Sequence, residues 1–283
     1  MSNLEKKVEN RIISLILSFL LSVFLLITTA TLIVNGFILS RDGVIGSLRE
    51  ANFHEGAYDD LRNTLEDRLI PTGLPNTILD DAFTLKSMYI DLNDYVTSMF
   101  ANQLPNLERD SIEEILNYNI DDHLLEIGLS REEIEDEAID EIVNVVIDNY
   151  NDYVSSPFIT YMARVSNLFQ GHLRLLIISG LVGTLITAVI AYLVSRRSSH
   201  FAVRNFGFSF GTAALMLIVA PLALRIWGGY HRLGIGPEYV YNFVVAHIER
   251  TIFVFFLAGA IFIVLYIIFI IISARLYKKQ LQA

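Results

Sequence analysis

Residues 12–40, IISLILSFLLSVFLLITTATLIVNGFILS, run for 29 positions without a charged side chain. A helix that crosses a membrane needs about 20 predominantly apolar residues, so this run is long enough to cross a bilayer with some tilt. A cleaved signal peptide has a shorter apolar region, of about 7–15 residues, followed by a small-residue cleavage site. The run therefore predicts an uncleaved membrane anchor that follows a short cytoplasmic tail at residues 1–11.

A strongly acidic block follows this anchor. Residues 41–171 carry 27 Asp and Glu against 8 Lys and Arg, whereas the rest of the chain carries 4 Asp and Glu against 13 Lys and Arg. Apolar residues recur at helical spacing through the block, and the sequence shows no alternation typical of strands. Prolines and glycines at residues 71–75 and 105 separate the helical patterns. The block is predicted to be an all-helical domain in which one-sided apolar stripes form a common core.

Capping signals mark helix boundaries within the block. Ser111 with Glu114, and Ser130 with Glu133, have the spacing of a capping box, in which each side chain satisfies a backbone amide of the first helical turn. Gly128 is expected to follow the end of the helix that Ser111 begins, because glycine readily adopts the left-handed backbone conformation.

Three further apolar segments follow the block, at residues 172–195, 206–225 and 251–274. A basic linker at residues 196–205 joins the first two. A loop at residues 226–250, predicted to contain an interfacial helix, precedes the last, and residues 275–283 form a tail. The predicted fold is all-α: a four-span transmembrane helix bundle with an extracytoplasmic all-helical domain inserted between the first and second spans.

The placement of Lys and Arg predicts the orientation of the chain, because these residues are enriched in cytoplasmic loops. Four spans bring three separate basic clusters to one side of the membrane. Both termini are therefore predicted to be cytoplasmic, and residues 41–171 extracytoplasmic, in the plasma membrane. Arg225, Arg232 and Arg250 have the opposite placement. The clusters consist of Lys6, Lys7 and Arg11, of Arg196, Arg197 and Arg204, and of Arg275, Lys278 and Lys279.

The composition favours a bacterial source and excludes some classes of binding partner. The chain has no cysteine, which excludes disulfides and thiolate metal sites. It also has no Asn-x-Ser/Thr sequon, and both absences favour a bacterial source for an outward-facing domain. A net charge of −10 argues against binding to nucleic acid, which needs a basic surface.

Small residues in two spans predict close helix packing. Ser179, Gly183, Thr187 and Ala191 recur every four residues, and Gly207 with Gly211 forms a GxxxG pair. Such residues let helix backbones approach closely, either within the bundle or against a helix of a partner protein.

The sequence offers little for catalysis. It contains no HExxH, GxSxG or P-loop pattern. No ionisable residue lies well inside a predicted span, which argues against ion-coupled transport. One metal hypothesis remains, an extracytoplasmic site formed by His172, His231, His247 and Glu249. No cofactor is predicted.

The leading functional prediction is non-enzymatic. The outer helical domain binds or senses an envelope partner, and the spans pack in the lipid bilayer or against a membrane partner. One alternative is a permease-like subunit driven by an ATPase, because the layout of four spans with a large first outer loop is similar to that of such subunits in topology. A second alternative is a membrane enzyme that uses the metal site. No family is assigned.

Overall fold

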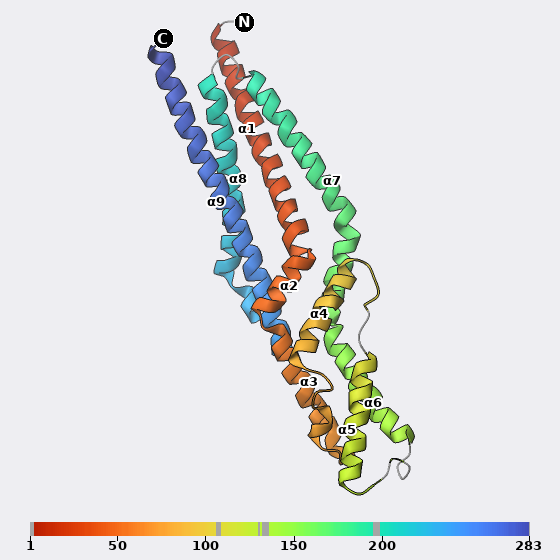
Figure 1. Ribbon diagram of the computed structural model, residues 1–283. Helices are drawn as coiled ribbons and strands as arrows, with labels where there is room; N and C mark the ends of the chain where they lie inside the picture. The colour runs from red at the N-terminus through yellow and green to blue at the C-terminus, as the bar shows by residue number, and fades with distance from the viewer. Residues whose placement is uncertain (1–2, 106–108, 130, 132–135, 195–198, 283) are drawn as a thin grey trace. The chain divides into compact units, whose positions relative to one another are not determined.

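The computed structural model describes residues 3–105, 109–129, 131, 136–194 and 199–282. All regular structure within these residues is helical, without a strand, so the predicted all-α class is confirmed (Figure 1). The helices group into two compact units. Unit 1 consists of Met1–Ile38, Phe169–Leu233 and Ile248–Ala283, and unit 2 consists of Leu39–Leu168 and Gly234–His247.

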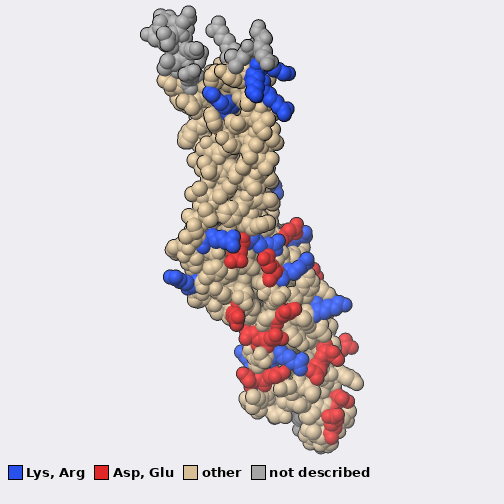
Figure 2. Space-filling view, turned by 90° about the vertical axis from the view of Figure 1, so that its left-hand side faces the viewer, with Lys and Arg blue, Asp and Glu red and all other residues tan. Residues whose placement is uncertain are grey.

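Unit 1 contains four long apolar helices. They are α1 (Asn3–Ile33), which continues into the short π-helix η1 (Val34–Ile38), the second part of α7 (Pro157–Val194), α8 (Ser199–Trp227) and most of α9 (Glu238–Gln282). A short 3₁₀ helix, η5 (Gly229–Arg232), follows α8. The stretches long and apolar enough to cross a membrane are Ile12–Ile38, Pro157–Val194, His200–Arg232 and Glu238–Gln280, which fits a membrane protein. Figure 2 shows a wide band of uncharged surface on these helices.

Polar contacts join three helix ends within unit 1. The side-chain amide of Asn205 donates to the Ser14 hydroxyl, and the Ser209 hydroxyl donates to the Ser18 carbonyl at 2.8 Å. The His200 ring nitrogen Nδ1 lies 2.6 Å from the Gln280 side-chain oxygen. The start of α8 therefore lies beside both the start of α1 and the end of α9.

These contacts bring the predicted basic clusters to one end of unit 1. Arg204 lies in the first turns of α8, and the tail cluster lies in the last turns of α9. Lys6, Lys7 and Arg11 lie in the first turns of α1. Arg196 and Arg197 are outside the described residues. Lys and Arg gather at this end of the uncharged band in Figure 2.

Unit 2 is a cluster of amphipathic helices. It contains α2 (Arg41–Glu50), α3 (Phe53–Leu69), α4 (Leu85–Phe100), α5 (Arg109–Glu126) and α6 (Asp136–Val154). The short 3₁₀ helices η2 (Ile70–Thr72) and η3 (Asn76–Leu79) lie between α3 and α4. The first turns of α7 and α9 also belong to it.

The core of unit 2 is organised along α3. Its buried face repeats every fourth residue, and none of the five side chains is more than 3% exposed. Burying each large aliphatic or aromatic side chain contributes about 1.5–3 kcal/mol, so this stripe is a principal source of the stability of the unit. The five residues are Phe53, Ala57, Leu61, Leu65 and Leu69.

The predicted capping signals have mixed outcomes. α5 begins two residues before Ser111, so the predicted box at Ser111 is not its start, and the box at residues 130–133 lies outside the described residues. A capping box is formed instead by Thr84 and Ser87 at the start of α4, where each hydroxyl accepts a hydrogen bond from the other's amide at 3.0 and 2.8 Å. Gly128 follows α5 with a φ of 78°, as predicted.

The loop predicted at residues 226–250 differs most from the structure. α9 already begins at Glu238, and its residues up to His247 are part of unit 2. Phe243 is 1% exposed, and its ring packs edge-on against Phe53 and Phe158 with centroids 5.8 and 5.5 Å apart. Aromatic residues next to a span suit a membrane interface, but here they complete a protein core.

Candidate ligand-binding cleft

A cleft of about 490 Å³ opens in unit 2 between α3 and the start of α9. Its lining holds four carboxylates, three side-chain amides and one tyrosine ring, and it includes no Lys or Arg. The lining residues are Ala51, Asn52, Glu55, Gly56, Asp59, Asp60, Asn63, Pro237, Glu238, Tyr239 and Asn242.

One face of α3 forms the first wall of the cleft. The lining positions between residues 52 and 63 are spaced by three and four, and such residues lie above one another on a helix. Asn52 begins this wall as the N-cap of α3, with a left-handed φ of 49° that asparagine tolerates better than most residues.

Gly56 lets the second wall come close. A Cβ atom at Gly56 would lie 2.6 Å from the Cβ of Tyr239, far inside van der Waals contact. Glycine at this position therefore allows the first turn of α9 to pack directly on α3. This contact places Glu238 and Tyr239 opposite the α3 carboxylates.

Aromatic packing fixes the position of Tyr239. Its ring stands edge-on to Phe53, with centroids 4.9 Å apart, and lies roughly parallel to Tyr153 at 6.4 Å. The Tyr153 hydroxyl donates to the Oδ2 of Asp60 at 2.9 Å and lies 3.1 Å from the Thr64 hydroxyl. Burial raises the pKa of Tyr153, so its hydroxyl keeps its proton and its hydrogen bond to Asp60 to a higher pH than an exposed tyrosine would.

The negative charge of the cleft is largely unpaired within the described residues. Glu55, Asp59 and Glu238 have no ion-pair partner there. Arg62, the closest basic residue along α3, is not a lining residue. The four carboxylates therefore create a local negative potential inside a concave surface, where field lines are focused.

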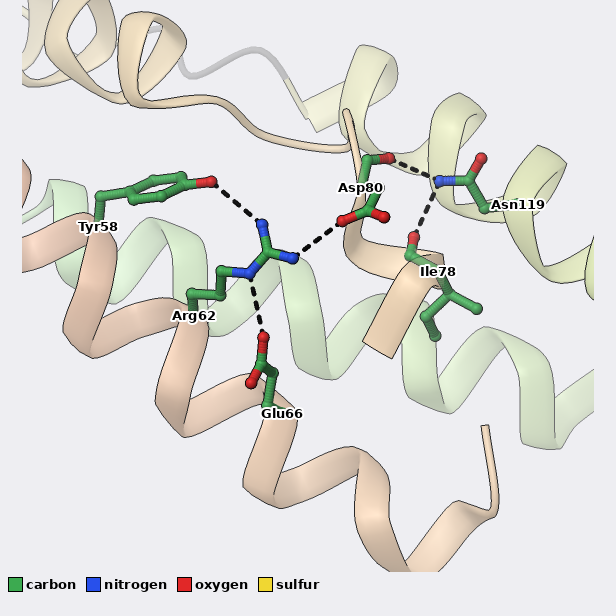
Figure 3. Close-up of polar contacts among 6 residues, drawn as sticks. All are labelled: Tyr58, Arg62, Glu66, Ile78, Asp80 and Asn119. Carbon is green, nitrogen blue, oxygen red and sulfur yellow. Dashed lines mark hydrogen bonds and ion pairs between the residues drawn. The ribbon is translucent and has the colours of Figure 1, made fainter. Parts of the chain in front are cut away.

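Arg62 is occupied by a separate network (Figure 3). Its guanidinium donates to the Tyr58 hydroxyl at 3.4 Å, to Glu66 at 3.0 Å and to Asp80 at 2.9 Å. These hydrogen bonds raise the pKa of Arg62. The Asn119 amide extends the network from α5 by donating to the carbonyls of Ile78 and Asp80 at 2.9 and 2.8 Å. Arg62 thus ties α3 to the segment before α4 rather than to the cleft.

The geometry favours an organic cation over a metal ion. Within the described ranges, no group of three or more His, Cys, Asp or Glu side chains could hold a metal ion. The cleft carboxylates are distributed along two walls, and Tyr239 lies on the α9 wall beside Glu238. Ammonium and guanidinium groups bind favourably to carboxylates and to aromatic rings, and the lining contains both.

The four residues of the predicted metal site belong to both units. The Nε2 of His231 and the Oε1 of Glu249 lie 3.7 Å apart in unit 1. In the same unit, the His172 ring packs against Phe169 with centroids 6.4 Å apart. His247 belongs to unit 2, where its Nδ1 lies 2.9 Å from the Ser47 hydroxyl.

The predicted small-residue stripe of α7 faces α1 in part. A Cβ at Gly183 would lie 2.5 Å from the Phe24 ring of α1. Thr187 and Ala191 are buried, each 5% exposed. Ser179 is exposed, however, and Gly180 takes its place by packing directly against Thr28.

The glycine pair of α8 packs against α9. A Cβ at Gly207 would lie 3.2 Å from the Cβ of Phe269, and one at Gly211 would lie 3.1 Å from the Tyr266 ring. These contacts are within unit 1, so both small-residue motifs have partner helices in the same chain.

Comparison with protein-family models, with curated proteins and with solved structures found no match for this chain. The α3 half of the cleft could have been found from the spacing of polar residues between positions 52 and 63. The α9 half carried no such signal, because Glu238, Tyr239 and Asn242 are about 180 positions away along the chain.

Proposed function

We propose that this chain is a bacterial multi-pass plasma-membrane protein whose unit 2 lies outside the cytoplasm and binds a cationic segment of an envelope partner. The acidic cleft carries the proposal, because it combines four carboxylates, three amides and a tyrosine ring with no basic residue in its lining. Its volume of about 490 Å³ suits one or two Lys or Arg side chains of a partner rather than a folded surface.

The basic end of unit 1 supports this orientation. Lys and Arg on the start of α8 and the end of α9 favour the cytoplasmic side. The larger part of unit 2, Leu39–Leu168, begins after the first candidate span, and its smaller part, Gly234–His247, begins after the third. Both parts would then be extracytoplasmic.

α9 connects the cleft to a candidate membrane-spanning segment, so ligand binding could be transmitted along this helix. Glu238, Tyr239 and Asn242 line the cleft on the first turns of a helix that continues to Gln282 in unit 1. A ligand held by these residues acts directly on a candidate membrane-spanning helix.

The test uses the full chain in detergent micelles and a fluorescein-labelled peptide of alternating lysine and glycine. Fluorescence anisotropy should show saturable binding that weakens as salt is raised, because salt screens the charges. The D59N/E238Q variant should bind at least tenfold more weakly. The matched control D67N/D152N removes two exposed carboxylates outside the cleft and should bind as the wild type does. Equal losses in the two variants, or no saturable binding by the wild type, would refute the proposal.

A further inference from the structure

Unit 1 contains an apolar groove, the lateral groove, between α1, α8 and α9. Its volume is about 800 Å³. Thr251 is the one residue of its lining with a polar side chain, and several aliphatic side chains on its walls are more than a third exposed. The lining consists of Leu26, Ala30, Leu215, Met216, Leu217, Val219, Ala220, Pro221, Ala223, Leu224, Thr251, Ile252 and Phe255.

Two arginines stand where the groove meets one end of these helices. Arg225 directly follows the lining residue Leu224, lies one helical turn beyond Pro221, and forms no ion pair within the described residues. Arg250 directly precedes the lining residue Thr251, and its guanidinium lies 5.5 Å from the centre of the Phe37 ring in η1, which continues α1. α8, α9 and the η1 continuation of α1 thus each have a residue at this end of the groove, which is opposite to the basic end of unit 1.

Trp227 indicates that this end of the helices lies at the membrane–water interface. It is the single tryptophan of the chain, it is 71% exposed, and it lies two positions beyond Arg225. Exposed tryptophan at the end of a spanning helix is typical of the membrane–water interface, at the level of lipid headgroups. The groove itself extends from this level into the apolar part of unit 1.

A phospholipid matches this arrangement, because its phosphate would lie at the level of the arginines and its acyl chain along the apolar groove. In a bilayer, two apolar surfaces gain little from association, so an apolar groove alone does not select an occupant. The arginines supply the selection, because basic pockets between transmembrane helices bind anionic headgroups. We propose that the lateral groove binds an acyl chain of an anionic phospholipid whose phosphate is held by Arg225 and Arg250. The site gives a role to two arginines whose placement runs against the positive-inside pattern, and it is independent of the acidic cleft.

The single tryptophan makes the site directly measurable. The full chain is reconstituted in phosphatidylcholine vesicles that contain increasing fractions of phosphatidylglycerol brominated near the glycerol end of its acyl chains. Bound brominated lipid quenches Trp227 fluorescence. Brominated phosphatidylcholine at the same fractions measures quenching by surrounding lipid. Brominated phosphatidylglycerol is expected to quench more strongly at low fractions and to saturate.

Variants distinguish lipid binding in the groove from nonspecific attraction of anionic lipid to basic residues. R225Q and R250Q should each lower the relative affinity for phosphatidylglycerol by about fivefold. A220F, which fills the groove from an exposed lining position, should remove the excess quenching while both arginines remain. R174Q removes an exposed arginine of α7 as the matched charge control and should behave as the wild type. Far-UV circular dichroism confirms that each variant is folded.

Three outcomes would overturn the proposal. Equal quenching by the two brominated lipids would show that the groove does not select an anionic lipid. Excess quenching that survives in folded A220F would place the lipid outside the groove. A helix of a second copy could fill the groove instead. Quenching by both lipids would then fall as the protein-to-lipid ratio rises, without excess quenching by brominated phosphatidylglycerol, and this result would contradict the proposal.

Discussion

The Nδ1 of His247 and the Oγ of Ser47 lie 2.9 Å apart, although 200 residues separate them in the chain. Both side chains are buried, with Ser47 at 0% and His247 at 7% exposure. The Ser47 hydroxyl also donates to the Gly43 carbonyl of its own helix at 2.9 Å, so His247 is the donor in the contact between the two side chains. This hydrogen bond joins α2 to the first part of α9 within unit 2.

The first prediction concerns this pair. S47A should destabilise unit 2 by about 1–3 kcal/mol, because it leaves the buried ring N–H of His247 without its acceptor. The double variant S47A/H247L should be less destabilised than the sum of the single variants, with a coupling of about 0.5–3 kcal/mol. Chemical denaturation in detergent micelles measures both values. S155A is the control, since Ser155 directly follows α6 and its hydroxyl donates to the local backbone carbonyl of Asn151. Strict additivity would show that the contact is energetically unimportant.

The second prediction concerns Gly56. Replacing a helical glycine by alanine usually gains up to about 1 kcal/mol from helix propensity. At Gly56 the new methyl group would meet the Cβ of Tyr239 at 2.6 Å, and overpacking of this kind costs about 1–3 kcal/mol. The steric effect dominates because that Cβ cannot move without moving the backbone of α9.

We therefore expect G56A to be destabilising and to weaken peptide binding in the cleft. G171A provides the contrast, since no atom lies within 4 Å of a Cβ at Gly171 in α7. It should be neutral or slightly stabilising. Thermal unfolding in micelles compares the two variants, and an equally stable G56A would mean that α9 is free to separate from α3.

The all-helical class and the four apolar helices could be predicted, because helical periodicity and long uncharged runs are local properties of the sequence. The positions of the helix ends were harder to predict from the sequence. Ser87 completes the capping box of α4 with a hydroxyl, whereas the usual pattern has Glu or Gln at that position.

The α7 stripe shows a second limit. Residues four apart advance 400° around an α-helix, so each step drifts 40° from the previous one. Ser179 has left the face that holds Thr187 and Ala191, whereas Gly180, seven positions before Thr187, remains on it. A helix face is followed by alternating steps of three and four.

Local patterns could have indicated the α3 wall of the cleft but not the cleft as a whole. Its two walls come from α3 and α9, and the aromatic residues of α9 are equally suited to a membrane interface. Their tertiary contacts, such as those of Tyr239 with Gly56 and of Phe243 with Phe53, show that they pack within unit 2.

The third prediction concerns alkaline pH. Burial raises the pKa of Tyr153 in the folded protein above its unfolded value of about 10. Its stabilising contribution is therefore fully present below about pH 10 and is lost as the pH rises from there through the folded pKa. The Y153F variant lacks the ionisable hydroxyl and should show a smaller decrease in stability over this range. Its stability near pH 8 should be lower, because it lacks the hydrogen bond to Asp60. Chemical denaturation at a series of pH values from 8 to 11 in micelles tests this, and parallel curves for the two proteins would contradict it.

The fourth prediction separates the two faces of α7. G183L should weaken the packing of α7 on α1, because even a Cβ at this position would lie 2.5 Å from the Phe24 ring. The expected loss is about 1–3 kcal/mol, the usual cost of overpacking. S179L adds the same side chain at an exposed position of the same helix and should leave thermal unfolding in micelles unchanged.

The pair also tests whether the exposed face has a partner. If a helix of another membrane protein packs against Ser179 in the cell, S179L disrupts co-purification of that protein while leaving the isolated chain stable. G183L has the reverse pattern, because its effect arises between α1 and α7 of one chain. Equal destabilisation of the isolated protein by both variants would show that the Gly180–Ala191 face is not the one that holds these two helices together.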